Sequence, residues 1–294
     1  MSEKNYILVS PVKDEEKYIE RTIQCVLQQE VLPSAWIIVD DGSRDNTRAI
    51  VEKYLASYRW MTLITLPTGT RRQPGSGIIR AFNAGFEHVK DRNFDFIVKF
   101  DCDMEVPANY FAGLIERFAR DPKLGIASGI YLEEKNAAWV PVKMPHYHAA
   151  GQTKMVRAKC FAEIGGFVAS RGWDTVDEIM AQAQGWKTQH FEDLYFLHLK
   201  KEGSGIGFLR TNQMHGEIFY LTGGSKRFLL LKALHRLIFG KPFFIGGVLV
   251  VWGFLKAWLS RRPKLVNREQ EDLYKHLLDQ RIIAGIRGLA HVRN

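Results

Sequence analysis

The sequence predicts a doubly wound α/β fold with a mostly parallel central sheet and helices on both of its faces. Three observations predict it: short apolar runs alternate with helical stripes to about residue 130, the runs show little polar alternation, and 46% of the 294 residues are apolar. Strands of a parallel sheet are buried on both faces and therefore read as continuous apolar runs. Strands that alternate with helical patterns are typical of βαβ units.

The elements follow in order along the first half of the chain. The apolar runs predict strands at 6–10, 35–39, 61–66 and 94–100. Apolar residues that recur with a helical period between these runs predict helices at 19–27, 78–89 and 111–118. One more helix is expected to reach Tyr58, with Asp45 or Asn46 at its N-cap, because short polar side chains bind the free N–H groups there.

The second half is mixed and then changes character. A short helix at 158–164 is expected to end in Gly165-Gly166, and another at 177–184 is closed by Gly185, because glycine commonly stops helices. From Phe228 onward the sequence is strongly apolar with helical spacing. We therefore expect two domains, residues 1–225 and 226–294.

Charge is concentrated in the second expected domain. The net charge is +9, from 41 Lys and Arg against 32 Asp and Glu, and residues 226–264 contain nine of these cations and no acid. A basic surface spread over the chain would indicate nucleic acid, but this one adjoins an apolar run at 243–255. That run is shorter than the roughly 20 residues that span a bilayer. We expect interfacial helices on an anionic membrane surface, with a true span, a buried helical hairpin or an oligomer contact as alternatives.

Cysteine usage indicates the compartment. The three cysteines are scattered without a C-x-x-C pair, which is typical of free thiols in the cytosol. The first residues lack the basic and apolar stretches of a signal peptide. We expect a cytoplasmic protein bound peripherally to the inner face of the cell membrane.

Paired acids follow two of the predicted strands, where ligands bind in open parallel sheets. Asp40 and Asp41 follow the second strand, where ligand contact is favoured over turn chemistry alone. Asp101 and Asp103 follow the fourth. Two carboxylates at i and i+2 repel each other unless a cation lies between them, and oxygen ligands suit Mg²⁺ or Mn²⁺. A solvated loop is the alternative for this second pair.

Taken together, these segments closely resemble the family 2 glycosyltransferases, which have the Rossmann-like GT-A fold. The resemblance covers roughly residues 5–190 and follows the family's order of motifs. The matching segments are 9–19 (VSPVKDEEKYI), 38–47 (IVDDGSRDNT), Gly77 with 81–85 (AFNAG), 100–103 (FDCD), 164–167 (IGGF) and 172–178 (GWDTVDE).

The resemblance implies an inverting transfer from a nucleoside diphosphate sugar. Asp41 matches the family acid that binds the base, usually uracil, and Asp101 and Asp103 match the D-x-D motif that holds Mn²⁺ or Mg²⁺ on the diphosphate. His198 is similar to a C-terminal histidine that completes the metal shell. The full set of implied nucleotide-binding residues is Pro11, Asp14, Asp40, Asp41, Gly77, Arg80, Asp101 and Cys102.

The resemblance also implies the catalytic base. The family base lies in a Glu-Asp motif before a helix, with a glycine about eleven residues later. Counting back from Gly185 gives Asp174, although Trp173 stands where the family has Glu, and Asp177 is the second candidate. Such a carboxylate takes the proton of the attacking sugar hydroxyl.

The implied function is transfer of one sugar, with a UDP-sugar as the expected donor. The Q-x-x-R-W motif and multiple spans of the processive synthases are missing from the sequence, which favours a bacterial membrane-associated, non-processive enzyme acting on a lipid-linked or cell-surface glycan acceptor. Two alternatives are weighed. A nucleotidyltransferase should have a Gly-rich N-terminal loop, which 10–18 lacks. A non-catalytic, membrane-bound sugar-nucleotide-binding module is favoured only by Trp173.

Overall fold

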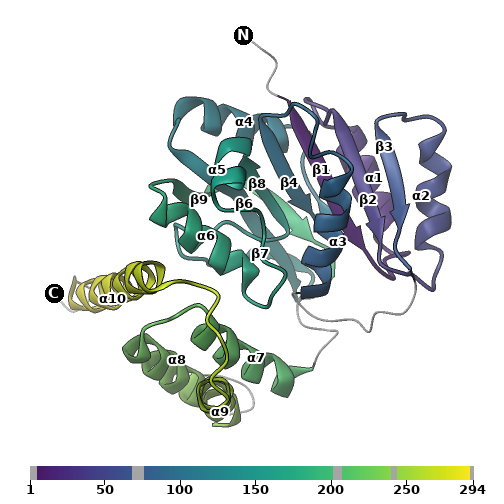
Figure 1. Ribbon diagram of the computed structural model, residues 1–294. Helices are drawn as coiled ribbons and strands as arrows, with labels where there is room; N and C mark the ends of the chain where they lie inside the picture. The colour runs from purple at the N-terminus through teal and green to yellow at the C-terminus, as the bar shows by residue number, and fades with distance from the viewer. Residues whose placement is uncertain (1–4, 68–75, 201–206, 240–243, 292–294) are drawn as a thin grey trace. The chain divides into compact units, whose positions relative to one another are not determined.

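The structure is a computed structural model that describes residues 5–67, 76–200, 207–239 and 244–291 (Figure 1). The chain divides into two compact units, Met1–Lys201 and Glu202–Asn294. The first unit is a sheet covered by helices, and the second consists of helices.

The first unit contains one mixed sheet. Its described strands are β1 (Tyr6–Val12), β2 (Ala35–Asp40), β3 (Met61–Thr65), β4 (Phe96–Phe100), β5 (Met104–Glu105), β6 (Leu124–Lys135), β7 (Ala138–Pro141), β8 (Thr153–Arg157) and β9 (Lys187–His198). They follow the order β3-β2-β1-β4-β8-β6-β9-β5, with β7 paired to β6. The four predicted strands are confirmed, and they lie side by side and parallel at one end of the sheet.

Helices cover both faces of this sheet, as predicted. The helices of the first unit are α1 (Ile19–Leu27), α2 (Thr47–Leu55), α3 (Ser76–Glu87), α4 (Tyr110–Arg120), α5 (Ala158–Glu163) and α6 (Trp173–Ala183). One apolar core joins the sheet to α1, α2 and α4, and a second joins it to α3, α5 and α6. Because side chains alternate along a strand, neighbouring β4 residues such as Val98 and Ile97 serve the two cores in turn.

The expectation of a mostly parallel sheet is wrong for its second half. Strand β8 runs antiparallel to both β4 and β6, while β6 and β9 are parallel. Parallel neighbours need a crossover, usually a helix, and no helix lies between β6 and β8. The chain therefore returns through β7 and pairs antiparallel.

Two helix ends also differ from the prediction. Helix α2 ends at Leu55 rather than near Tyr58, and α6 begins at Trp173 rather than Asp177. Gly172 precedes α6 with a φ of 78°, a left-handed conformation that glycine adopts without a steric penalty. The earlier start places Asp174 in the first turn of α6 and Asp177 in the next.

The second unit contains α7 (Phe208–Leu221), α8 (Lys226–Phe239), α9 (Ile245–Leu259) and α10 (Arg268–His291). The prediction placed the domain boundary after residue 225, whereas the compact units divide after Lys201. The reason is that α7 packs tightly against α9: a Cβ on Gly216 would lie 1.9 Å from the carbonyl oxygen of Val250, and one on Gly253 would lie 2.0 Å from that of Gln213.

The expected helical segment at 226–264 is present as α8 and α9, although Phe243, the first residue of the predicted apolar run, lies outside the described residues. None of the helices in the described ranges has both the length and the apolar composition that a membrane crossing requires.

Candidate functional site

Hydrogen bonds join the loops that follow β1 and β2. The backbone N–H of Asp14 donates to Ser43 Oγ at 3.0 Å, and the N–H of Arg44 donates to Asp14 Oδ1 at 2.8 Å. Asp14 has a φ of 55°, which few residues other than glycine adopt. The two loops predicted to contact a nucleotide therefore form one connected rim.

The adjacent acids at the end of β2 have different environments. Asp40 is buried, and its Oδ1 accepts the N–H of Ser43 at 2.8 Å, which is turn chemistry. The Asp41 carboxylate lies 3.5 Å from Lys13 Nζ and is one-fifth exposed. Of this pair, Asp41 is the acid that a ligand can reach directly.

The remaining nucleotide candidates lie on nearby elements. Pro11 lies in β1 opposite Val39 and beyond the residues that pair with β4, so its missing N–H leaves no ladder bond unmade there. Gly77 and Arg80 lie in the first turns of α3, and the Arg80 side chain is exposed. Cys102 is buried between the two acids of the D-x-D motif.

Asp101 follows β4 and is neutralised from within the sheet. Its Oδ1 lies 2.6 Å from Nζ of Lys99, whose side chain is 2% exposed. Burial raises the pKa of Asp101, and the Lys99 ammonium opposes this effect. A buried cation therefore helps to hold Asp101 near the expected diphosphate.

Asp103 is brought to His198 by strand pairing. Strand β5 begins one residue after Asp103 and pairs with the end of β9, with Met104 opposite His198. As a result His198 Nε2 lies 3.6 Å from Asp103 Oδ2. The two residues are far apart in sequence, and the pairing of β5 with β9 brings them together.

This donor set suits a divalent cation that is shared with a ligand. The described residues contain no group of three or more His, Cys, Asp and Glu side chains arranged to hold a metal. Mg²⁺ and similar ions are usually held by one or two carboxylates, with substrate phosphates and water completing the shell. Asp103 and the His198 imidazole, 3.6 Å apart, are two side chains of the kind that such a partial shell uses.

Two buried lysines connect this end of β4 to the start of α6. Lys99 in β4 and Lys154 in β8 are directly opposed across the antiparallel pair. Both ammonium groups face the ring of Trp173, with Nζ–centroid distances of 5.3 Å and 5.2 Å. Cations are attracted to the face of an indole, so Trp173 packs against both Lys99 and Lys154.

Lys154 also holds the candidate base region. Its Nζ donates to the carbonyl oxygen of Asp174 at 2.8 Å, to the Asp177 carboxylate at 2.9 and 3.0 Å, and to Glu178 Oε1 at 3.2 Å. Burial raises the pKa of Asp177 to about 7, against the lowering effect of Lys154. Asp177 is thus committed to a buried ion cluster, while the Asp174 side chain is half-buried.

Sequence reasoning missed the lysines and Glu178, which accepts the N–H of Ala149 at 2.7 Å and lies 3.0 Å from Nδ1 of His148. A usable signal was present, because Lys99 interrupts the apolar run FIVKF two residues before Asp101. A lysine inside a strand buried on both faces requires an acidic partner.

Loss of the Lys154 ammonium should strongly destabilise the first unit. Lys154→Met leaves Asp177 and Glu178 buried without their cation, and breaking such a pair typically costs about 3–5 kcal/mol. We expect this loss in urea unfolding near neutral pH. The loss of stability should shrink at lower pH. The folded-state pKa of Asp177 is raised above its unfolded value, so protonation of this buried carboxyl favours the folded state. This stabilisation is present below the unfolded pKa and disappears as the pH rises through the folded pKa.

Lys159→Met is the matched control for this experiment. Lys159 lies on α5, is 74% exposed and is 3.9 Å from Glu163. Exposed pairs contribute little to stability, so this variant should unfold like the parent protein. Equal, small losses in both variants would contradict the assigned role of Lys154.

Comparison with known proteins places the chain in a family. The profile of Glycosyl transferase family 2 matches residues 7–171, more than half of the chain. Poly-beta-1,6-N-acetyl-D-glucosamine synthase of Staphylococcus aureus is 30% identical over 116 residues, which is 40% of this chain and 26% of that protein. The matched segment therefore spans about a quarter of the length of these curated relatives.

Solved structures share the fold. A mannosyltransferase, PcManGT of Pyrobaculum calidifontis, in complex with GDP-Man and Mn²⁺, aligns over 97% of this chain and 87% of its own, with a TM-score of 0.57 and 15% identity. S. aureus TarS 1–349 in complex with UDP-GlcNAc aligns over 92% and 78%, with a TM-score of 0.55 and 16% identity. These likenesses confirm an α/β GT-A fold, and by the match of its profile the chain belongs to glycosyl transferase family 2, a family of glycosyltransferases.

Proposed function

We propose that the protein is an inverting glycosyltransferase that moves one sugar from a nucleoside diphosphate sugar, with UDP-sugars first among the donors, to a hydroxyl of a lipid-linked or cell-surface glycan acceptor. One observation carries the proposal. The contacts of Trp173 with Lys99 and Lys154 place the start of α6, with Asp174, beside the β4 exit that bears Asp101 and Asp103. This proximity supports a single site in which Asp101 and Asp103 bind the diphosphate and Asp174 is the base.

The chemistry follows from these positions. Asp174 takes the proton of the acceptor hydroxyl as its oxygen attacks the anomeric carbon. The bond from that carbon to the diphosphate breaks, and its electron pair leaves with the diphosphate, so a single displacement inverts the configuration. Asp41 and the rim that contains Asp14 would hold the nucleoside.

Asp101, Asp103 and His198 would hold a divalent cation, Mn²⁺ or Mg²⁺. When bound, such an ion offsets the negative charge that develops on the leaving diphosphate. Lys99 neutralises Asp101 from inside the sheet, so the protein itself contributes one positive charge near the leaving group. The mannosyltransferase complex described above contains Mn²⁺ in its own site.

The hypothesis of a binding module without catalysis rested on Trp173 in place of an acid. In this chain the Trp173 ring packs against two lysines, and Asp174 in the next position is half-buried. That arrangement favours catalysis. Membership of glycosyl transferase family 2 likewise favours sugar transfer over nucleotidyl transfer.

We also propose that the enzyme works at the cytoplasmic face of the cell membrane, where lipid-linked acceptors are accessible. The support is the run of nine cations without an acid at 226–264. Such clusters favour anionic lipid surfaces.

A donor screen tests the proposed function. The full chain with Mn²⁺ is incubated with UDP- and GDP-sugars, and release of UDP or GDP is measured. We expect slow hydrolysis of one donor class, because water replaces the acceptor at the base, and weak or no release from the other. Tight binding of UDP with no release from any donor, even when membrane extract supplies acceptors, would favour the non-catalytic module.

A further inference from the structure

Helix α9 buries mainly small residues and exposes many of its large apolar side chains, which is unusual for a helix that faces water. Its buried positions are small or short: Gly246, Gly247, Val250, Gly253 and Ala257. Seven large apolar residues, six in α9 and Phe244 just before it, are 38–71% exposed: Phe244, Ile245, Val248, Trp252, Leu255, Trp258 and Leu259. A helix that is apolar all round is normally enclosed by protein or by lipid.

Helix α8 has part of the same arrangement. Two of its four Lys and Arg side chains turn toward the other helices of the unit, with Lys232 Nζ 5.9 Å from the ring centroid of Phe219 and Arg236 bonded to Asn212 Oδ1. Burial lowers the pKa of Lys232 to about 8. Four large apolar side chains of α8 are instead exposed: Leu230, Leu231, Leu234 and Ile238, each 48–64% exposed.

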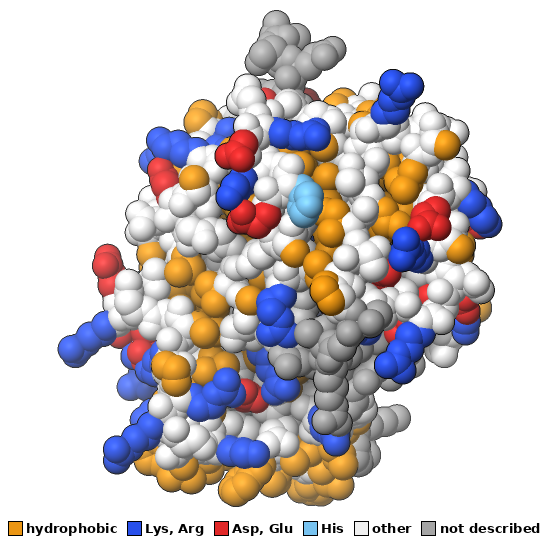
Figure 2. All heavy atoms as spheres, turned by 45° about the vertical axis from the view of Figure 1, so that its right-hand side comes forward, with side chains coloured by type: hydrophobic (Ala, Val, Ile, Leu, Met, Phe, Trp, Pro, Cys, Tyr) orange, Lys and Arg blue, Asp and Glu red, His pale blue; other side chains and the backbone are white. Residues whose placement is uncertain are grey.

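This orientation differs from the simple expectation for an interfacial helix, in which the cationic stripe faces outward to water or head groups. Here Lys232 and Arg236 of α8 pack inside the unit, and three of its five leucines face out. We call the outward side chains of α8 and α9 the apolar face. Hydrophobic side chains gather over these helices at the bottom of the view in Figure 2.

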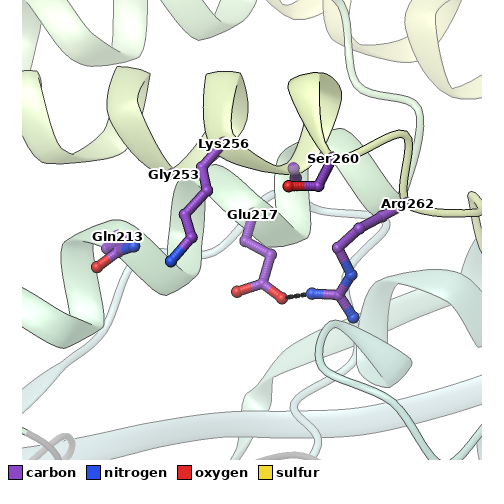
Figure 3. A pocket seen from close by; sticks show the side chains of 7 residues that line it. Gln213, Glu217, Gly253, Lys256, Ser260 and Arg262 are labelled. Carbon is purple, nitrogen blue, oxygen red and sulfur yellow. Dashed lines mark hydrogen bonds and ion pairs between the residues drawn. The ribbon is translucent and has the colours of Figure 1, made fainter.

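Helix α9 also borders a polar pocket beside α7. The pocket is lined by Gln213 and Glu217 of α7 and by Lys256, Ser260 and Arg262, and Figure 3 shows the Glu217–Arg262 ion pair within it. Lys256 is four residues after Trp252, so the two lie one helical turn apart on the same side of α9. The apolar face therefore has a cationic border at this pocket.

We propose that the apolar face inserts into the boundary between head groups and acyl chains of an anionic bilayer. This rests on the proposed function only in that a lipid-linked acceptor would lie on the same surface. Helix α9 has 15 residues, about 22 Å at 1.5 Å per residue, which suits a helix that lies in the interface. Tryptophan is favoured at that depth because its ring is apolar and its N–H is polar.

Charge supports lipid as the occupant over a second copy of the chain. Lys226 and Arg227 at the start of α8, and Lys256 and Arg261 near the end of α9, are exposed. Residues 226–264 offer no carboxylate to pair with such cations, so contact between two copies would bring like charges together. Acidic phospholipid head groups would neutralise them at about 1 kcal/mol per cation.

The test uses the full chain and four substitutions on the apolar face, Leu230→Ser, Leu234→Ser, Trp252→Ser and Trp258→Ser. These side chains are 52–64% exposed, so the folded unit depends little on them. Binding to phosphatidylcholine vesicles that contain phosphatidylglycerol is measured by co-sedimentation. We expect the partition coefficient to fall by roughly 10²-fold or more, because each apolar side chain leaves a lipid environment.

The matched control replaces exposed apolar residues of the first unit, Leu32→Ser and Trp139→Ser, which are 48% and 37% exposed. This control should bind vesicles like the parent. High salt should weaken parent binding and leave a residual, because salt screens the cations and not the apolar contribution. Brominated lipids should quench the fluorescence of Trp252 and Trp258 in the parent. This quenching is measured as the difference in fluorescence between the parent and the fourfold variant, which lacks both side chains.

Three results would overturn the proposal. The fourfold variant could bind vesicles like the parent, the control could lose as much vesicle binding as the fourfold variant, or the parent could fail to bind vesicles and form a dimer that the fourfold variant lacks.

Donor hydrolysis distinguishes failure of this membrane proposal from failure of the proposed function. The fourfold variant should hydrolyse donor at the parent rate, and an inactive parent that still binds vesicles would contradict only the proposed function.

Discussion

Asp174→Asn should reduce turnover by roughly 10²–10⁴-fold while donor binding stays nearly intact. The carboxylate is the group that we expect to take the acceptor proton, and general-base catalysis typically contributes a factor of that size. The amide retains the shape of the side chain but cannot accept the proton. Turnover is measured as nucleotide release with acceptor present, and donor binding is measured by calorimetry with Mn²⁺.

Two variants make this result specific. Asp177→Asn should mainly lower stability, because Asp177 is held by Lys154 inside the first unit. Asp91→Asn, in the exposed turn after α3, should behave like the parent. If Asp177→Asn loses turnover with normal stability and Asp174→Asn does not, Asp177 is the base.

Removal of divalent metal should abolish transfer. We expect EDTA to lower the rate by about 10²-fold or more, since metal assistance is generally worth several kcal/mol, and Mn²⁺ or Mg²⁺ to restore it. Asp103→Asn and His198→Gln should weaken Mn²⁺ binding in the presence of UDP, which electron paramagnetic resonance measures without reference to activity. Their positions, 3.6 Å apart across the β5–β9 pairing, are the physical reason.

Asp91→Asn serves again as the comparison and should bind Mn²⁺ like the parent. Full transfer activity in the presence of EDTA would contradict the proposal that Asp101, Asp103 and His198 bind a metal required for the reaction. Normal Mn²⁺ binding by both Asp103→Asn and His198→Gln would place the ion elsewhere.

The sequence predicted the parallel half of the sheet because its strands read as apolar runs, and β1, β2 and β4 are buried along their whole length. It failed for β6 to β8, where strands follow one another without a helix between them, so that nothing in the pattern specifies their direction. Periodicity also could not show that α6 begins at Trp173, since the conformation of Gly172 determines that start.

The candidate site was also predicted only in part. The order of the motifs named Asp101, Asp103 and Asp174 as candidates, and the family resemblance added His198, which strand pairing places beside Asp103. Spacing could not reveal Lys154, because its acids lie more than twenty residues away along the chain. The inverted orientation of α8 was equally hidden, since a helical wheel shows a cationic stripe but not which side faces protein.

The direct opposition of Lys99 and Lys154 links two parts of the proposed site through the sheet. One lysine holds Asp101, and the other holds the helix that bears Asp174. Both stand on adjacent strands whose alignment is set by backbone hydrogen bonds, so the sheet determines how far apart these two acids are anchored. A slip of either strand by one residue would turn its own lysine to the opposite face. The separation that the proposed transfer requires is therefore built into the pairing of β4 with β8, and not into the loops around it.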